Sequence, residues 1–382
     1  MNFDLSEEHE AFRLVVRAFA EREIAPYAEA WDRDHHFPIE VVRSMADLGL
    51  FGLVFPEKWG GADADFTTLC IAIEELGRVD QSVGITLSAA VGLGANPIFQ
   101  FGDESQKARW LPDLVRGRAL GAFGLTEPDA GSDAGATRTR ATRDSISGEW
   151  VLNGAKAFIT NSGTAITSIV TVTARTDDGG ISAFVVPSGT PGMSVEPPYR
   201  KMGWHASDTH GITLADCRIP EDHLLGNLGS GFRNFLAILD DGRIAISALA
   251  VGCAQACLDL SLAYASERQA FGGPIGRYQG VAFPLSDLAV AVENARMLTY
   301  KAAWLKDQGR PFKQAAAMAK LYSTEAAVHA TRTATQIFGG SGFIDETVVS
   351  RMYRDAKILE IGEGTSEIQR LVIARELGLP IT

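Results

Sequence analysis

The chain has 382 residues and a net charge of −12 with His neutral, because 47 Asp and Glu residues outnumber 35 Lys and Arg residues. Its 46% hydrophobic and 21% charged residues are typical of a folded globular protein, which excludes disordered and fibrous chains, and the length predicts two or three domains. The acidic balance argues against general binding to nucleic acid or to a membrane surface, so we expect neither as a partner.

The cysteines and histidines give no sign of a metal site. The four cysteines form no CxxC pair, so neither a disulfide framework nor a zinc site is predicted, and the seven histidines lack HExxH or similar spacing. The acidic start, MNFDLSEEHEAF, lacks a basic-then-apolar leader, so no secretory signal is predicted. We expect a cytoplasmic protein in a bacterium, or a protein of the mitochondrial matrix if a transit peptide has been removed.

The first domain, residues 1–118, is predicted to be helical. Apolar residues recur with helical spacing within 12–19, and 66–77 is a further helix with its last glycine as the C-cap. Residues 81–102 carry no charge, but their internal glycines and Pro97 argue against a membrane span. We interpret this stretch as a buried helix followed by a turn.

The second domain, residues 119–227, is predicted to be a small antiparallel β-domain. Runs rich in β-branched residues at 166–176 and 181–187 are separated by Gly, Pro and Asp turns. The pair Asn153-Gly154 lies between two alternating segments and is a hairpin signal.

The third domain, residues 228–382, is predicted to be a helical bundle. Long helical patterns rich in Ala and Leu cover 230–268, 281–307 and 311–337, and a shorter helix begins at Ser366. The fold class is therefore α+β, mainly α. A seam between the β-domain and the bundle is the place where we expect a ligand.

Two segments have both a structural and a functional interpretation. Residues 123–133, FGLTEPDAGSD, form a turn, but Thr126, Ser132 and nearby amides can also donate to a phosphate or to the edge of a flavin. Residues 240–243, DDGR, interrupt an apolar helix. An intrahelical salt bridge on a solvated face is the favoured interpretation of this segment, and a pocket that grips a polar ligand is the alternative.

Glu363 has no evident structural role in the sequence. It lies between Gly362 and Gly364, just before a helix whose Ser366 and Gln369 match an S-x-x-Q capping box. Flexible backbone on both sides allows its carboxylate to project into a cavity.

Taken in order, these segments resemble the acyl-CoA dehydrogenase family over nearly the whole chain. The motifs that carry the resemblance are FGLTEPDAGSD, QIFGGSG and EGTSEIQR, and LDDGRIAIS followed by ERQAFGGPIGRYQ is most similar to the short-chain, butyryl-type branch. The resemblance implies an N-terminal helical domain, a middle β-domain and a C-terminal four-helix bundle, assembled as a homotetramer. It also implies non-covalent FAD, an acyl-CoA substrate and electron-transferring flavoprotein as the oxidant.

The resemblance assigns roles to individual residues. Those expected to line the flavin are Phe123, Leu125, Thr126, Ser132, Phe158, Ile159 and Thr160. Those expected at the FAD diphosphate and adenine, partly in a neighbouring subunit, are Arg268, Phe271, Gln279, Gln336, Gly339 and Gly340, with Thr365 and Glu367 completing that site. Those expected to contact the acyl-CoA are Ser132, Asp240, Asp241, Gly242, Arg243 and Gly364.

Glu363 matches the catalytic base of the family. In that role it removes the pro-R α-proton while the β-hydrogen leaves as hydride to flavin N5, which yields the trans-2-enoyl-CoA. A carboxylate of ordinary pKa is too weak a base for a thioester α-carbon. The thioester oxygen must therefore be hydrogen-bonded, and the resemblance implies a flavin ribityl hydroxyl and the Glu363 amide as the donors. We also expect a dry site that raises the carboxylate pKa.

Three residues depart from those common in the family. Gly362 stands in place of Tyr, Phe158 in place of Trp and His205 in place of Arg. We hypothesise that Gly362 leaves room for a branched or bulkier acyl group. Gly242 occupies the position that supplies the base in the isovaleryl branch, which leaves Glu363 as the candidate.

Other functions remain open at this point. The same superfamily contains flavin oxidases and monooxygenases, although a monooxygenase needs no base at Glu363, and the acyl group can be bound to a carrier protein in place of CoA. A distant branch contains flavin-containing DNA-binding stress proteins, against which the net charge of −12 speaks.

Overall fold

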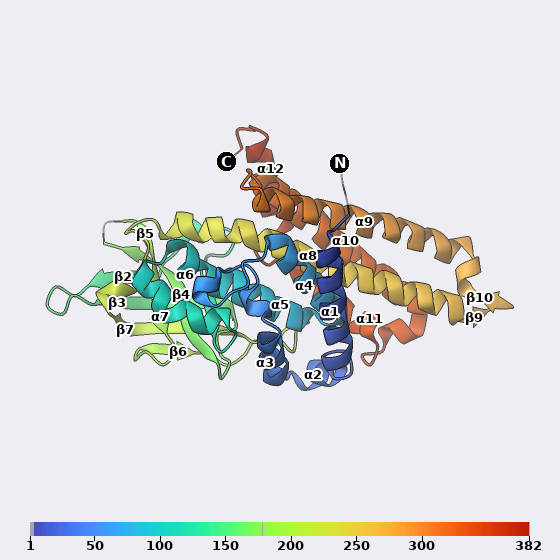
Figure 1. The fold of residues 1–382 in the computed structure, drawn as a ribbon, viewed down its shortest axis with the longest axis horizontal. Coiled ribbons are helices and arrows are strands. Elements are labelled where there is room, and N and C mark those ends of the chain that lie inside the picture. Colours follow the sequence, from blue (N-terminus) through green and yellow to red (C-terminus); the bar gives the residue numbers. More distant parts are fainter. Residues whose placement is uncertain (1–3, 178, 382) are drawn as a thin grey trace.

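The computed structural model describes residues 4–177 and 179–381, and its elements follow the predicted order of helices, sheet and helices (Figure 1). The β-domain lies at one end of an elongated molecule, and two long helices extend to the other end. The predicted fold class, α+β and mainly α, is confirmed.

The N-terminal part is helical as predicted, but the glycine predicted to end its fourth helix lies inside that helix. The α-helices of this part are α1 (Glu7–Glu23), α2 (Ala28–Asp34), α3 (Ile39–Asp47), α4 (Phe66–Val79), α5 (Gln81–Ala89), α6 (Asn96–Phe101) and α7 (Glu104–Val115). Helix α4 is capped by Asp65 and continues beyond Gly77, so the C-cap interpretation of Gly77 is wrong. A Cβ atom on Gly77 would lie 2.6 Å from Leu249 Cδ1, so this glycine serves close helix packing.

The uncharged stretch is helical throughout. A π-helical segment, Ala90–Ala95, joins α5 to α6, so the predicted turn is replaced by a continuous helix with a π-bulge. Residues 81–101 and the first helix of the C-terminal part are long and apolar enough to cross a membrane, but 83% of each apolar window is buried inside the fold. Both are therefore explained as core helices.

The β-domain is one twisted sheet that is mixed rather than purely antiparallel. Its strands are β1 (Leu120–Gly124), β2 (Arg140–Arg143), β3 (Trp150–Thr160), β4 (Thr167–Thr176), β5 (Ile181–Pro187), β6 (Met193–Val195), β7 (Thr209–Ile219) and β8 (Leu224–Leu225). The order is β6-β7-β3-β2-β4-β5-β8, with β1 on β4. Both β1 and β2 pair with β4 in parallel, so the prediction of a wholly antiparallel domain is corrected in this respect.

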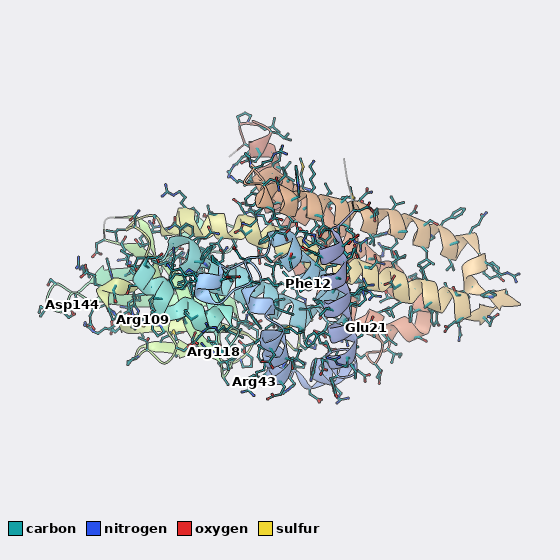
Figure 2. All side chains as sticks on the ribbon, viewed as in Figure 1. Phe12, Glu21, Arg43, Arg109, Arg118 and Asp144 are labelled. Atoms are coloured by element: carbon teal, nitrogen blue, oxygen red, sulfur yellow. The ribbon has the colours of Figure 1, made fainter. Side chains whose placement is uncertain are left out.

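Asn153 and Gly154 do not form the predicted hairpin turn. They lie inside β3, which pairs with β7 along its length and has register shifts at Leu152/Gly154 and Lys156/Ile159. The turn before β3 lies at Asp144, whose side chain accepts a hydrogen bond from Arg218 at 2.9 Å. Figure 2 shows Asp144 at the far end of the β-domain.

The C-terminal part is the predicted helical bundle with one additional helix. Its elements are α8 (Gly231–Glu267), the small hairpin β9 (Gln269–Ala270) and β10 (Gly273–Pro274), α9 (Gln279–Asp307), α10 (Lys313–Phe338), α11 (Val348–Ala356) and α12 (Ser366–Glu376). The additional helix is α11, which lies between the predicted helix at 311–337 and the one that begins at Ser366. Helix α8 packs against α4, α9 and α10, so the N-terminal helices and the bundle share one hydrophobic core.

Candidate active site

Glu363 lies in a strained turn just before α12. Its φ is +53° and that of Gly364 is +96°, and a left-handed backbone at a residue with a side chain is unfavourable unless neighbouring contacts impose it. Gln369 Nε2 donates to Gly364 O at 2.9 Å and to Glu363 O at 3.3 Å, which fixes both peptide groups of the turn.

The cap of α12 is one residue earlier than predicted. Thr365 Oγ1 accepts a hydrogen bond from Ile368 N at 3.3 Å, so Thr365 and not Ser366 is the N-cap. Gln369 does reach back over the helix start, but to carbonyl groups of the turn rather than to the cap. The predicted S-x-x-Q capping box is therefore wrong, and the Gln369 side chain holds the turn of Glu363 instead.

Gly242 on α8 makes room for the Glu363 carboxylate. A Cβ atom on Gly242 would overlap Oε2 of Glu363 and lie 2.7 Å from its Cδ, which is too close for two carbon atoms. Two residues 121 positions apart therefore meet in the fold, and the contact requires that one of them be glycine.

The carboxylate of Glu363 is shielded and has no direct partner. The residue is partly exposed as a whole, but Oε2 is buried and accepts no hydrogen bond from the described residues. Burial raises the pKa of Glu363 to about 7, while the positive charges of Lys320 and Arg243 oppose this rise and Asp241 adds to it. An acid with this pKa is partly ionised at neutral pH and is a stronger base than an exposed Glu.

The backbone amide of Glu363 is also available. Among the described residues, no carbonyl or side chain accepts a hydrogen bond from Glu363 N. A proton acceptor and a hydrogen-bond donor thus belong to the same residue, which is the pair needed to take a proton from a carbon beside a carbonyl and to stabilise the oxygen.

Residues 241–243 are buried and Asp240 is partly buried, so the predicted salt bridge on a solvated face is only half right. Arg243 and Asp240 do form an i,i+3 ion pair, but the exposed fractions of their side chains are 6% and 18%. Asp241 faces another side of α8 and accepts from Lys306 Nζ at 2.7 Å, and Asn96 and Gln100 each donate to it at 3.1 Å. Asp241 therefore ties α6 and α9 to the wall that carries Gly242.

A buried ion pair holds the loop that contains Thr126. Lys156 on β3 is 0% exposed, and its Nζ binds Glu127 Oε1 at 2.7 Å, Thr173 Oγ1 at 3.1 Å and Leu125 O at 3.3 Å. The other oxygen of Glu127 accepts from Arg138 N at 2.7 Å. Both ends of the loop between β1 and β2 are thereby fixed.

The residues predicted to line the flavin form a suitable surface. Phe158 has a φ of +61° at the bulge of β3, which turns its ring outward so that the residue is 64% exposed. Ala157 N donates to Thr126 O at 2.9 Å, so the Thr126 loop lies beside this bulge. The hydroxyls of Thr126 and Thr160 make no hydrogen bond with the described residues. An aromatic face beside unused hydroxyls fits a flavin ring with its polar edge.

The other predicted flavin residues divide into two groups. Phe123, Leu125 and Ile159 are buried and support the surface from below, whereas Ser132 is exposed. Phe123 stacks on Phe235 of α8 with ring centroids 4.0 Å apart. Phe235 precedes Gly242 by seven residues, or roughly 10 Å along a helix, so the surface predicted to bind the flavin and the Glu363 turn adjoin the same part of α8.

The residues predicted at the FAD diphosphate and adenine do not join this surface within one chain. Arg268 and Phe271 lie at the β9–β10 hairpin, which projects at the opposite end of the molecule from the β-domain (Figure 1). Phe338, next to Gly339, stacks on Tyr264 near the same end, with centroids 4.2 Å apart. Residues predicted for one cofactor are thus separated by the length of the molecule, while Thr365 and Glu367 stay beside Glu363.

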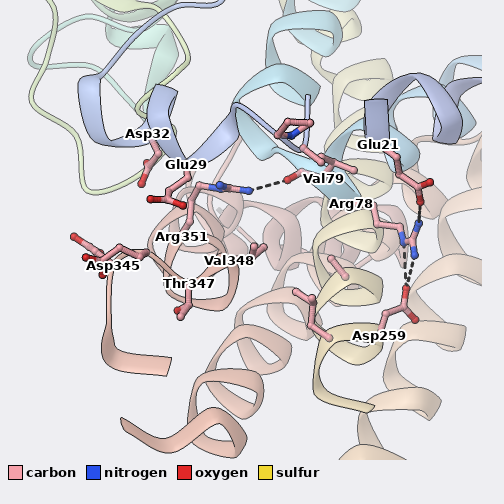
Figure 3. A pocket seen from close by; sticks show the side chains of 15 residues that line it. Glu21, Glu29, Asp32, Arg78, Val79, Asp259, Asp345, Thr347, Val348 and Arg351 are labelled. Atoms are coloured by element: carbon pink, nitrogen blue, oxygen red, sulfur yellow. Dashed lines mark hydrogen bonds and ion pairs between the residues drawn. The ribbon is translucent and has the colours of Figure 1, made fainter. Parts of the chain in front are cut away.

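A cavity among the helices lies away from Glu363. It measures about 300 Å³ between α1, α2, α4, α8 and α11, and its lining is mostly charged (Figure 3). Arg351 donates to Val79 O at 3.0 Å there, and Arg78 binds Asp259 at 2.9 Å, so these cations are engaged in internal contacts. Glu363 does not line this cavity.

Sequence reasoning missed several residues that shape the site. Lys320 and Lys156 are each a single charge in an otherwise apolar stretch, and this was the available signal, whereas Lys306 is followed directly by Asp307 and gave no such signal. The aromatic partner Phe235 and the amides Asn96 and Gln100 carried no such signal. Among the described residues no group of His, Cys, Asp or Glu is suited to hold a metal ion.

Three domain models match consecutive parts of the chain. They are the acyl-CoA dehydrogenase N-terminal domain over residues 6–118, the middle domain over residues 122–217 and the C-terminal domain over residues 229–378.

The chain is also similar to curated proteins. It is 52% identical over 380 residues to the probable acyl-CoA dehydrogenase YngJ of Bacillus subtilis, which covers 99% of this chain and 100% of that protein. It is 46% identical over 378 residues to the mitochondrial short-chain specific acyl-CoA dehydrogenase of Mus musculus, which covers 98% and 91% of the two chains.

Solved structures have the same fold. Butyryl-CoA dehydrogenase from Megasphaera elsdenii is 42% identical with a TM-score of 0.95, over 99% of this chain and 100% of that one. An acyl-CoA dehydrogenase from Bacillus anthracis, complexed with FAD, is 32% identical with a TM-score of 0.93, over 99% of this chain and 69% of that one.

Proposed function

The chain belongs to the acyl-CoA dehydrogenase family, and from this premise we propose that it oxidises a short or branched acyl-CoA to the trans-2-enoyl-CoA with Glu363 as the base. It is an oxidoreductase with FAD as its cofactor. The observation that carries the proposal is the Glu363 carboxylate, which is buried without a partner beside Gly242 while the amide of the same residue has no acceptor among the described residues.

Glu363 takes the proton. The thioester carbonyl accepts a hydrogen bond from Glu363 N, which stabilises negative charge on oxygen as the α C–H bond breaks and the proton moves to the carboxylate. FAD supplies the two-electron acceptor that takes the β-hydrogen as hydride. Filling of the site by the acyl chain excludes water and strengthens both interactions of Glu363.

Gly362 widens the acyl side of the site. A Cβ atom at this position would meet only Ile358 O, at 3.5 Å, which is an ordinary contact. The backbone is therefore compatible with a larger side chain, and its absence leaves space next to the base. A branched acyl group such as isobutyryl or 2-methylbutyryl is the substrate that uses this space, and the short-chain and butyryl-CoA relatives favour a chain of this length.

FAD is held by two copies of the chain. One copy supplies the surface of Phe158, Thr126 and Thr160, and a second copy supplies Arg268, Phe271, Gln279 and the segment from Gln336 to Gly340. Two exposed apolar features support a homotetramer. Phe271 at the hairpin is 93% exposed. Along α9 an exposed apolar stripe repeats every seven residues and consists of Phe283, Val290, Met297 and Trp304.

The remaining contacts follow from the family. Asp240, Arg243, Gly364 and Ser132 lie on the acyl-CoA side, and electron-transferring flavoprotein receives the electrons. The protein works in the cytoplasm of a bacterium or, as in the mouse relative, in mitochondria.

A visible spectrum and an anaerobic titration test the proposal. The purified protein should show a flavin spectrum that bleaches with butyryl-, isobutyryl- or 2-methylbutyryl-CoA, and electron-transferring flavoprotein should restore it. A kcat/KM that falls steeply from butyryl-CoA to both branched substrates would overturn the role of Gly362. Rapid oxygen consumption with substrate would indicate an oxidase in place of a dehydrogenase. Bleaching only by acyl-carrier-protein thioesters would indicate that the acyl group is bound to a carrier protein and not to CoA.

A further inference from the structure

Lys320 is a charged side chain with no access to solvent. It lies in the middle of α10, in the Ala-rich run AAAMAKLY, and is 0% exposed. Its Nζ donates a hydrogen bond to Gly364 O at 2.8 Å, and no carboxylate among the described residues lies within ion-pair distance of it. A buried ammonium without a carboxylate partner is costly, so it calls for a functional explanation.

The acceptor of Lys320 is the carbonyl of the turn that carries Glu363. Gly364 O also accepts from Gln369 Nε2 at 2.9 Å, so two donors from α10 and α12 hold one peptide group. Glu363 has a left-handed backbone, and such a conformation persists only where surrounding contacts impose it. Lys320 is one of these contacts, and it links the turn to α10.

Lys320 also acts on the carboxylate through its charge. Glu363 faces Lys320 from α10 and Arg243 and Asp241 from α8. Arg243 is already paired with Asp240, whereas the positive charge of Lys320 has only a carbonyl group as partner. The two cations thus favour the ionised carboxylate without a hydrogen bond to Oε2, which leaves that oxygen able to accept a proton from a substrate.

We propose that Lys320 is a positioning residue for the base: held on Gly364 O, it fixes the Glu363 turn and favours the ionised form of the buried carboxylate without binding it. This inference rests on the proposed role of Glu363. It assigns the position and the ionisation of Glu363 in part to a residue on a different helix.

The charge state of Lys320 is consistent with this role at neutral pH. Burial lowers the pKa of Lys320 to about 8, while Glu363, Glu360 and Glu325 favour the ammonium and Arg243 disfavours it. The ammonium is therefore the main form below pH 8, and the support of the carboxylate weakens as the pH rises above that value.

Three variants of Lys320 separate its charge from its hydrogen bond. Lys320→Met removes both, Lys320→Gln keeps a donor for Gly364 O, and Lys320→Arg keeps the charge. Lys313→Met is the matched control, because Lys313 is on the same helix and its side chain is 52% exposed. Folding and FAD content are checked by circular dichroism and by the visible spectrum.

The first readout is the titration of Glu363 in the holoenzyme without substrate. The carbonyl stretch of its protonated carboxyl group is isolated by an infrared difference against Glu363→Gln. Lys320→Met and Lys320→Gln should raise the pKa of Glu363 by about one unit or more, and Lys320→Arg and Lys313→Met should leave it near the wild-type value. Equal pKa values of Glu363 in Lys320→Gln and Lys320→Arg would overturn the proposal. This comparison remains decisive even if Lys320→Met does not fold.

The second readout is the pH profile of anaerobic flavin reduction by butyryl-CoA. The limb that reports Glu363 should move to higher pH in Lys320→Gln, so that reduction is about tenfold slower at low pH and recovers as the pH rises. A uniform loss at all pH values would assign Lys320 a purely structural role. If Glu363→Gln reduces its flavin normally, the proposed function fails, but the infrared titration of Lys320 variants still decides its effect on Glu363.

Discussion

At the scale of single residues, the sequence indicated Glu363 as the candidate base but gave no sign of its surroundings. Glu363 stood out because two glycines flank it just before a helix, and in the structure its Oε2 atom is buried without a hydrogen-bond partner among the described residues. Its partners across the fold could not be predicted from spacing. Gly242 and Lys320 are separated from Glu363 by 121 and 43 positions, and only the packing of α8 and α10 against the turn brings them near.

The contact between Gly242 and Glu363 gives a prediction at this scale. Gly242→Ala places a methyl group where Glu363 Oε2 lies, so the carboxylate must move. A displacement of about 1 Å from the reacting atom costs on the order of 100-fold in rate. Stopped-flow measurement of flavin reduction by butyryl-CoA should show this loss with FAD content unchanged.

Gly280→Ala is the control for this variant. A Cβ atom on Gly280 would meet nothing within 4 Å, so its reduction rate should equal that of the wild type. A wild-type rate in Gly242→Ala would contradict the described position of the carboxylate.

At the scale of elements, strands and long helices were predicted well and their interruptions were not. The run at 181–187 is β5 as predicted, whereas Asn153-Gly154 lies inside β3 because pairing with β7 outweighs the local turn preference. Gly77 and the glycines of 90–95 were interpreted as helix ends or turns. Close packing explains Gly77, against Leu249, and Gly94, against Gly121 of β1, and the sequence gives no direct sign of that packing.

The loop between β1 and β2 depends on the buried pair of Lys156 and Glu127. Lys156→Met leaves the Glu127 carboxylate buried without its cation, which should lower the free energy of unfolding by about 3–5 kcal/mol. Urea denaturation measures this value, and FAD should bind more weakly because Thr126 lies in the loop.

An exposed ion pair provides the comparison for Lys156. Lys58 and Glu104 form a pair with both side chains more than half exposed, so Lys58→Met should lower the free energy of unfolding far less than Lys156→Met does. Similar costs for the two variants would contradict the anchoring role of Lys156.

At the scale of the whole molecule, three parts of the chain meet at His205. Its Nδ1 lies 2.9 Å from Asp32 Oδ1 of α2, and Arg354 of α11 also binds Asp32. The sequence marked His205 as a departure from the family but could not indicate that it connects the β-domain to both helical parts.

This junction should depend on pH. The hydrogen bond to Asp32 raises the pKa of His205 above its usual value of 6.5, against the opposing effects of burial and of Arg354. A raised pKa in the folded state means that the stabilisation is complete below pH 6.5 and is lost as the pH rises through the folded value. The melting temperature of His205→Gln should therefore lie furthest below that of the wild type at about pH 6 and approach it at about pH 9. A difference that grows with pH would contradict the ion pair.

The separation of the predicted FAD residues is the second feature at this scale. Phe271→Asp places a charge on the exposed tip of the hairpin, so it should lower both the oligomeric state and the FAD content. Light scattering after size exclusion and the ratio of visible to ultraviolet absorbance measure the two effects. Ile146→Asp, at a residue that is 97% exposed on the β-domain, should change neither. A tetramer with full FAD in Phe271→Asp would contradict a cofactor shared between copies.

The most direct test is anaerobic reduction of the flavin in Glu363→Gln. The amide is nearly isosteric with the carboxylate but accepts no proton, so the variant should keep FAD and bind butyryl-CoA while its flavin bleaches at least about 100-fold more slowly than in the wild type. Bleaching at the wild-type rate would show that another group removes the α-proton.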